Sequence, residues 1–191
     1  MKINESGRSM IEMLGVLAII GVLSVGGIAG YSKAMSVYKV NKTIDQLMQI
    51  TASTRSLFAG HKTYETLTKS GKPNMALIKK AHLVPDDMID GDIIVNTYGG
   101  VVELNCADKG NNRKNKAFSV SFAMIPQSSC IELASKEWGQ GKTSGLYKIT
   151  INGNTVHQAD AQDDNKEQVG VAKAVANCDK PVNNVIVWTF Y

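Results

Sequence analysis

The chain has 191 residues, of which 43% are hydrophobic, 20% charged and 6% aromatic. This composition excludes an intrinsically disordered chain, and the length suffices for one domain with a buried core and an appended segment. The net charge is only +4, and Lys and Arg form no continuous stripe, so nucleic acid is not expected as a direct ligand. Three cysteines without a Cys-x-x-Cys pair exclude a disulfide-rich scaffold and give no zinc or redox motif.

The segment from Met13 to Ser32 runs for twenty residues without a charge. As a helix it would span roughly 30 Å, the thickness of the hydrocarbon core of a bilayer. A cleaved secretory signal is one alternative, with Lys2 and Arg8 as its basic residues. However, the apolar stretch is longer than a usual signal core, and the acidic Glu12 stands at its start. A plain membrane anchor is the other alternative, which hydropathy alone leaves open.

Several glycines interrupt this apolar segment, as expected for a helix that packs closely on its neighbours. The spacing of two of them gives a GxxxG motif, which is weak because it arises often by chance. The candidate helix-packing residues are Gly15, Gly21, Gly26, Gly27 and Gly30, with the GxxxG spacing between Gly26 and Gly30.

The string GRSMIE, from Gly7 to Glu12, stands directly before the apolar run. Over about residues 1–35 this order resembles the type IV prepilin signature. The resemblance implies that a dedicated peptidase cuts after Gly7 on the cytoplasmic side, leaving Arg8 as an N-methylated first residue and Glu12 as the fifth. A carboxylate at the edge of a hydrocarbon stretch is costly unless it is paired. The terminal ammonium of a neighbouring subunit would be a suitable partner and would fix the axial stagger of stacked helices.

Two positions depart from the pattern of that family. Its first mature residue is usually Phe or Met, whereas this chain has Arg8, so methylation there is a weaker expectation. Its frequent helix-kinking proline is replaced by Ala29. The nearby glycines could loosen the helix instead, since each weakens it by up to about 1 kcal/mol relative to Ala.

Beyond Ser32 the helical period continues and the composition becomes amphipathic. We expect the helix to reach Ala59, with Gly60 as its stop, although a separate helix after a break at Gly30 is an alternative. The expected apolar stripe comprises Ala34, Met35, Tyr38, Ile44, Leu47, Met48, Ala52 and Leu57.

The rest of the chain reads as a short helix followed mainly by strands, a pattern typical of an α+β fold with an antiparallel sheet. Two hairpins are expected around Tyr98-Gly99-Gly100 and Asn152-Gly153-Asn154. The expected helices cover 74–82, 126–138 and 168–177, and the expected strands 92–96, 101–105, 117–125, 146–151, 155–158 and 184–191.

This C-terminal part also resembles the type IVb pilins, including the conjugative-plasmid and enteric bundle-forming groups. The similar parts are LVPDDM, IPQSSCIELA and the closing NNVIVWTF. The resemblance implies a disulfide between Cys130 and Cys178, among three pairings that the cysteines allow. On the chain-entropy model such a bridge stabilises by roughly 4 kcal/mol. Cys106 is left over and is expected to be buried on a strand; three buried thiols are the alternative.

Motifs for enzymatic chemistry are incomplete, so we expect no enzyme, no metal and no cofactor. The run Gly139 to Thr143 ends like a phosphate-binding loop, but Lys136 stands where that motif needs its first glycine. Asp86, Asp90 and Gly91 match only part of a calcium loop. The three histidines share no ligand spacing with one another or with a cysteine.

The resemblance therefore implies four segments: a leader (1–7), an apolar assembly helix (8–32), an amphipathic half-helix (33–59) and a globular head (60–191). The implied fold is a long N-terminal helix packed on a head with an antiparallel sheet. The implied function is a structural pilin that polymerises into a surface filament for adhesion, aggregation, DNA transfer or motility. Its partners would be copies of itself, the prepilin peptidase and the assembly machinery, first in the inner membrane and then outside the cell. A pseudopilin of a type II secretion system and an anchored periplasmic binding protein or enzyme are the alternatives.

Overall fold

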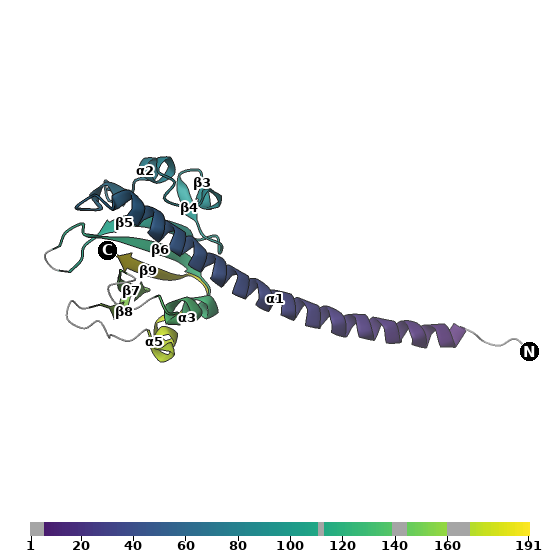
Figure 1. Cartoon of the computed structure of the whole chain (residues 1–191). Coiled ribbons are helices and arrows are strands. Elements are labelled where there is room, and N and C mark those ends of the chain that lie inside the picture. The colour runs from purple at the N-terminus through teal and green to yellow at the C-terminus, as the bar shows by residue number, and fades with distance from the viewer. Residues whose placement is uncertain (1–5, 111–112, 139–144, 160–168) are drawn as a thin grey trace, which may run out of the picture. The chain divides into compact units, whose positions relative to one another are not determined.

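The computed structural model describes residues 6–110, 113–138, 145–159 and 169–191. The chain divides into two compact units, Met1–Tyr38 and Lys39–Tyr191. One helix, α1, covers Ser6–Phe58 and so contributes to both units (Figure 1). The expected end of the helix near Ala59 is confirmed to within one residue, and no break occurs at Gly30.

The described part of the first unit is the N-terminal portion of α1, and none of its side chains from Met10 to Tyr38 is buried. Every side chain from Met10 to Ala34 is exposed, including the large aliphatic ones. Among the helices that the structure describes, α1 is long enough and apolar enough to span a membrane. An N-terminal signal segment can have the same length and composition. A helix that is apolar all round is normally covered by lipid or by other helices.

In the second unit, α1 buries one face, whose aliphatic and aromatic members are spaced three, four or eight residues apart. These residues are Val40, Ile44, Leu47, Ile50 and Phe58. Such a spacing places them on one side of a helix. Figure 1 shows this part of α1 lying across the sheet.

The apolar stripe expected from the sequence was partly wrong. Ile44 and Leu47 are buried, but Tyr38 and Met48 are each 56% exposed and Leu57 is 39% exposed. The buried face instead includes four polar residues, Thr43, Gln46, Thr51 and Thr54. The expected stripe contained apolar residues only, so it pointed to a different side of the helix from the face that is buried.

A connecting region leads from α1 to the sheet. It contains the 3-10 helix η1 (Glu65–Leu67), a small hairpin of β1 (Thr68–Lys69) and β2 (Lys72–Pro73), helix α2 (Met75–Lys80) and the 3-10 helix η2 (Asp86–Met88). The side chain of Asn74 accepts a hydrogen bond from the N–H of Leu77 and so caps α2. This confirms the short helix expected after Asn74, whereas the β1–β2 hairpin was not foreseen.

The head is built on a seven-stranded sheet with the order β3-β4-β5-β6-β9-β7-β8, in which every neighbouring pair is antiparallel. The α+β class with an antiparallel sheet is thus confirmed. The strands are β3 (Ile89–Asp90), β4 (Ile93–Val95), β5 (Val101–Ala107), β6 (Ala117–Ile125), β7 (Leu146–Ile151), β8 (Asn154–Gln158) and β9 (Asn184–Phe190).

One face of the sheet supplies most of the core. Alternate residues of the three central strands are buried: Val102, Leu104, Phe118, Val120, Phe122, Ile186, Trp188 and Phe190. Their cross-strand partners follow the register, for example Val120 opposite both Leu104 and Trp188. Together with the buried face of α1 they form one hydrophobic cluster.

Two further helices complete the head, α3 (Gln127–Ser135) and α5 (Val171–Asn177). Helix α3 stops before Trp138, which had been expected to end it. The indole N–H of Trp138 donates to the carbonyl of Leu133 at 2.8 Å, and the ring packs edge-on against Trp188. Residue 168, the expected start of α5, lies outside the described residues.

Candidate functional sites

The residues of the prepilin-like signature lie at the start of α1. The backbone of Gly7 and Arg8 belongs to the first turns of the helix, and Glu12 follows one turn later. The side chain of Glu12 is exposed among the exposed apolar residues Ile11 and Met13. Among the described side chains, no cation pairs with this carboxylate.

The glycines of the apolar segment pack against no other part of the chain that the structure describes. A Cβ atom added at Gly15, Gly21, Gly26, Gly27 or Gly30 would meet no other atom within 4 Å. Within the described residues, nothing therefore requires a glycine at these positions. Contact with a neighbouring helix from another molecule would give such a requirement.

The disulfide expected between Cys130 and Cys178 is confirmed. The two residues lie 48 positions apart in the sequence, with a Cα–Cα distance of 5.9 Å, and both are fully buried. Cys130 belongs to α3 and Cys178 caps the end of α5, so the bond ties these two helices together.

Cys106 is free, as expected, but the expectation that it is buried was wrong. It lies on β5 and is half-buried. Its backbone N–H donates to the hydroxyl of Thr68 at 2.9 Å. The position near the end of β5, beside the small β1–β2 hairpin, explains why the thiol is less covered than the residues in the middle of the sheet.

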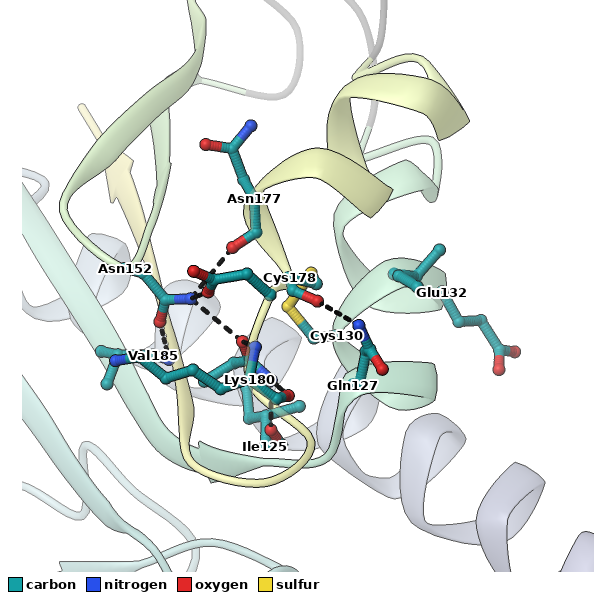
Figure 2. Close-up of a disulfide and its surroundings, with 12 residues drawn as sticks. Ile125, Gln127, Cys130, Glu132, Asn152, Asn177, Cys178, Lys180 and Val185 are labelled. Carbon is teal, nitrogen blue, oxygen red and sulfur yellow. Dashed lines mark hydrogen bonds between the residues drawn. A yellow bond between two sulfur atoms is a disulfide. The ribbon is translucent and has the colours of Figure 1, made fainter.

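Figure 2 shows Asn152 and Asn177 beside the disulfide. The side chain of Asn152 also contacts Asp179 and Asn184, and we call these four residues the asparagine cluster. Asn184 is fully buried at the start of β9. Its amide donates to the carbonyl of Ile125 at 3.0 Å and to the carbonyl of Lys180 at 2.7 Å. Its Oδ1 accepts from the backbone N–H of Lys180 and from Asn152.

Asn152, in the turn between β7 and β8, joins this cluster to the end of α5. Its Nδ2 lies 2.9 Å from the carbonyl of Asn177, 2.8 Å from Oδ1 of Asp179 and 3.0 Å from Oδ1 of Asn184. Its Oδ1 accepts from the N–H of Val185 at 3.0 Å. The segment after the disulfide is thus held by side-chain amides as well as by sulfur.

Sequence reasoning placed a hairpin turn at Asn152-Gly153 but missed that the asparagine side chain holds a distant segment. The consecutive asparagines at 183 and 184 were the available signal. Asn184 is the buried member, and both polar atoms of its amide are hydrogen-bonded. Such an amide fixes the position of the chain more strictly than an apolar contact does, because each hydrogen bond has a direction.

A second polar cluster fixes the turn between β4 and β5. Asn96 accepts hydrogen bonds from the N–H groups of Tyr98 and Gly100, and its amide donates to the carbonyl of Ala123 at 2.7 Å. Gly100 packs so tightly on β6 that a Cβ atom would overlap the backbone of Ala123. Only glycine fits at position 100, which explains why the turn sequence Tyr98-Gly99-Gly100 has a glycine there.

This turn also contacts α1. The hydroxyls of Thr43 and Thr97 lie 3.2 Å apart, and the ammonium of Lys39 lies 5.6 Å from the ring centre of Tyr98. Burial raises the pKa of Tyr98, and the nearby hydroxyls of Ser129 and Thr43 offset part of that shift. Tyr98 therefore links α1, the β4–β5 turn and α3.

The described residues contain no group of three or more His, Cys, Asp and Glu side chains that could hold a metal ion. The aspartates of the stretch considered as a calcium loop are exposed, and two of them pair with lysines, Asp87 with Lys42 and Asp92 with Lys79. The hydrogen bond and charge of Lys79 lower the pKa of Asp92. The phosphate-loop-like run lies largely in 139–144, outside the described residues.

The fold is that of the type IV pilins. A solved structure of TcpA, a type IV pilin from Vibrio cholerae El Tor biotype, matches with a TM-score of 0.59 and 10% identity, covering 81% of this chain and 99% of TcpA. A type IVb pilin from Salmonella typhi matches with a TM-score of 0.54 and 19% identity, covering 78% and 96%.

The sequence comparisons add the family. The major structural subunit of bundle-forming pilus from Escherichia coli O127:H6 is 26% identical over 163 residues, 81% of this chain and 80% of the relative. A family model described as PilS N terminal matches residues 37–191. The chain belongs to the PilS family; it is a type IVb-like pilin, a structural subunit of a type IV pilus. The match leaves the N-terminal signature outside its bounds.

Proposed function

We propose that this pilin is made as a precursor, that a prepilin peptidase removes Met1 to Gly7, and that the mature chain polymerises through α1 into a surface filament. The observation that carries the proposal is the apolar part of α1, whose side chains from Met10 to Ala34 are all exposed. Such a surface needs a bilayer before assembly and other helices after it.

In this proposal, Glu12 sets the register between subunits. Its carboxylate stands at the start of an otherwise uncharged stretch, where leaving it unpaired would be costly in an apolar environment. The terminal ammonium created at Arg8 by cleavage, on a neighbouring subunit, would neutralise it. The glycines at 15, 21, 26 and 30, which have open space around them in one chain, would let neighbouring helices approach closely.

The precursor would lie in the inner membrane with its head in the periplasm, where a disulfide such as Cys130–Cys178 can form. The assembled filament would be extracellular. A pseudopilin of a type II secretion system is less favoured, because the relative from Escherichia coli is by its name a subunit of a pilus. An anchored binding protein would leave the GRSMIE signature unexplained.

The test compares Glu12→Ala with Glu5→Ala, a matched carboxylate change on the other side of the proposed cleavage site. Mass spectrometry of sheared filaments should show chains that begin at Arg8. Glu12→Ala should be inserted and cleaved but should build few filaments, and it should be under-represented when co-expressed with the unchanged chain. Glu5→Ala should assemble normally. Filaments that retain Met1, or normal filament numbers from Glu12→Ala, would contradict the proposal.

A further inference from the structure

Asn152-Gly153 is the only Asn-Gly pair among the 191 residues. In such a pair the backbone nitrogen after the asparagine can attack the side-chain amide carbon. A C–N bond forms, closing a five-membered imide, and the amide nitrogen leaves as ammonia. Water then opens the ring at either carbonyl and gives aspartate or isoaspartate. Glycine favours the attack because it carries no side chain to hinder it.

The structure leaves the attacking side of this pair open. Asn152 and Gly153 form the two-residue turn between β7 and β8, with φ values of 50° and 89°, typical of a type I′ hairpin turn. Gly153 is exposed, and a Cβ atom added there would meet nothing within 4 Å. Solvent therefore reaches the nucleophile and any imide that forms.

The asparagine cluster restrains the other reactant. The amide of Asn152 is held by the carbonyl of Asn177, by Asp179 and by Asn184, and its oxygen is held by the N–H of Val185. The side chain must leave these partners before its carbon can turn toward Gly153. Conversion of Asn152 therefore requires the asparagine cluster to open locally. The rate of conversion then reports how often the cluster opens.

We propose that Asn152 is a spontaneous deamidation site, and that its conversion releases the segment from Cys178 to Asn184 from the β7–β8 turn. The NH2 group of the neutral side chain shares its two protons among three acceptors, one of which is the carboxylate of Asp179. Aspartate at this position would be ionised near neutral pH and would have no proton to donate. Two carboxylates and two further oxygens would then face one another.

Isoaspartate would disturb the site further, because it inserts a methylene group into the main chain of a turn that has room for two residues only. The change is irreversible, so it accumulates with the age of the molecule. The disulfide would stay intact, and the loss would be confined to the bonds that Asn152 makes. The reaction involves residues of the head only and does not depend on how α1 assembles.

The first test follows conversion in the full-length protein, in detergent, at mildly alkaline pH. Peptide mass spectrometry should show the Asn152 peptide gaining the mass of an amide-to-acid change, with isoaspartate, before any other asparagine peptide. Asn184→Ala removes one of the three acceptors of the Asn152 amide, together with the three hydrogen bonds that the Asn184 side chain makes to Ile125 and Lys180. It should speed conversion by roughly tenfold. Asn74→Ala, which removes the cap of α2 instead, should leave the rate at Asn152 unchanged.

The second test measures the consequence. Asn152→Asp should speed hydrogen exchange at the N–H groups of Lys180 and Val185, and acidification should partly restore protection because the new carboxyl is protonated. Asn152→Ala should show no such recovery. The proposal fails if Asn152 stays unconverted, in the unchanged protein and in Asn184→Ala, while the denatured chain converts fully. It also fails if Asn152→Asp leaves both exchange rates unchanged.

Discussion

The buried threonines of α1 differ in whether their hydroxyls have partners. The hydroxyl of Thr43 donates to the carbonyl of Lys39 at 2.8 Å and lies beside Thr97. The hydroxyls of Thr51 and Thr54 have no hydrogen-bond partner within the described part of the chain. A buried polar group without a partner costs about 1–3 kcal/mol, so α1 is bound to the sheet less favourably than an apolar face would be.

Replacing Thr54 by the similarly shaped valine should therefore raise the free energy of unfolding by about 1 kcal/mol, because an unsatisfied hydroxyl is removed. Thr43→Val is the matched control and should lower it by a similar amount, since two hydroxyl contacts are lost. Urea unfolding of the two variants measures both changes. If both variants change the free energy of unfolding in the same direction, then the Thr43 and Thr54 hydroxyls do not differ in hydrogen bonding as described.

Tyr98 should make the head sensitive to alkali. Its pKa is raised above the ordinary value of 10.0 by burial, so the folded state favours the neutral phenol. The stabilisation is therefore complete below pH 10 and is lost as pH rises through the higher pKa of the folded state. Tyr98→Phe should lose less stability than the unchanged chain between pH 9 and pH 11, roughly the range around that ordinary value.

Thermal unfolding across this pH range measures the difference. Burial also raises the pKa of Tyr64, so some alkaline loss should remain in Tyr98→Phe and should shrink further when Tyr64→Phe is added. Identical pH profiles for Tyr98→Phe and the unchanged chain would show that the buried phenol does not carry the effect.

At the scale of elements, the strands of three or more residues were predictable from the sequence and the two-residue strands were not. Strands β6 and β7 have the bounds 117–125 and 146–151 that their alternating residues indicate. The two-residue strands β1 and β2 are too short to show any period. The buried face of α1 was misplaced because the expected stripe contained apolar residues only, whereas Thr51 and Thr54 are buried. The asparagine cluster depends on contacts between segments far apart in sequence.

The disulfide should dominate the stability of the α3–α5 region. Replacing both Cys130 and Cys178 by serine removes a constraint over 48 residues and should lower the free energy of unfolding by roughly 4 kcal/mol on the chain-entropy model. Changing both residues avoids a leftover reactive thiol. The control is Cys106→Ser, which removes a free, half-buried thiol and should cost much less. Equal losses would show that the cross-link adds nothing beyond the buried side chains.

At the scale of the whole molecule, the sheet and the prepilin-like signature lie in different parts of the sequence. The PilS match begins at residue 37, and the compact unit that contains the sheet begins at Lys39. The residues that resemble the prepilin signature all precede both points. The head could therefore be inferred from its own core pattern, whereas the proposed assembly role of α1 depends on side chains, from Met10 to Ala34, that are all exposed in one chain.

This division predicts that the head folds without the apolar segment. No residue of the described hydrophobic core precedes Val40, so a chain that begins at Lys33 keeps every core contact and almost two turns of helix before the first of them. It should be soluble without detergent, form the Cys130–Cys178 disulfide and unfold in one cooperative transition. Its unfolding midpoint should match that of the head in the full-length chain in detergent. A truncated chain that aggregates, or whose disulfide is scrambled, would show that residues before Lys33 contribute to the fold itself.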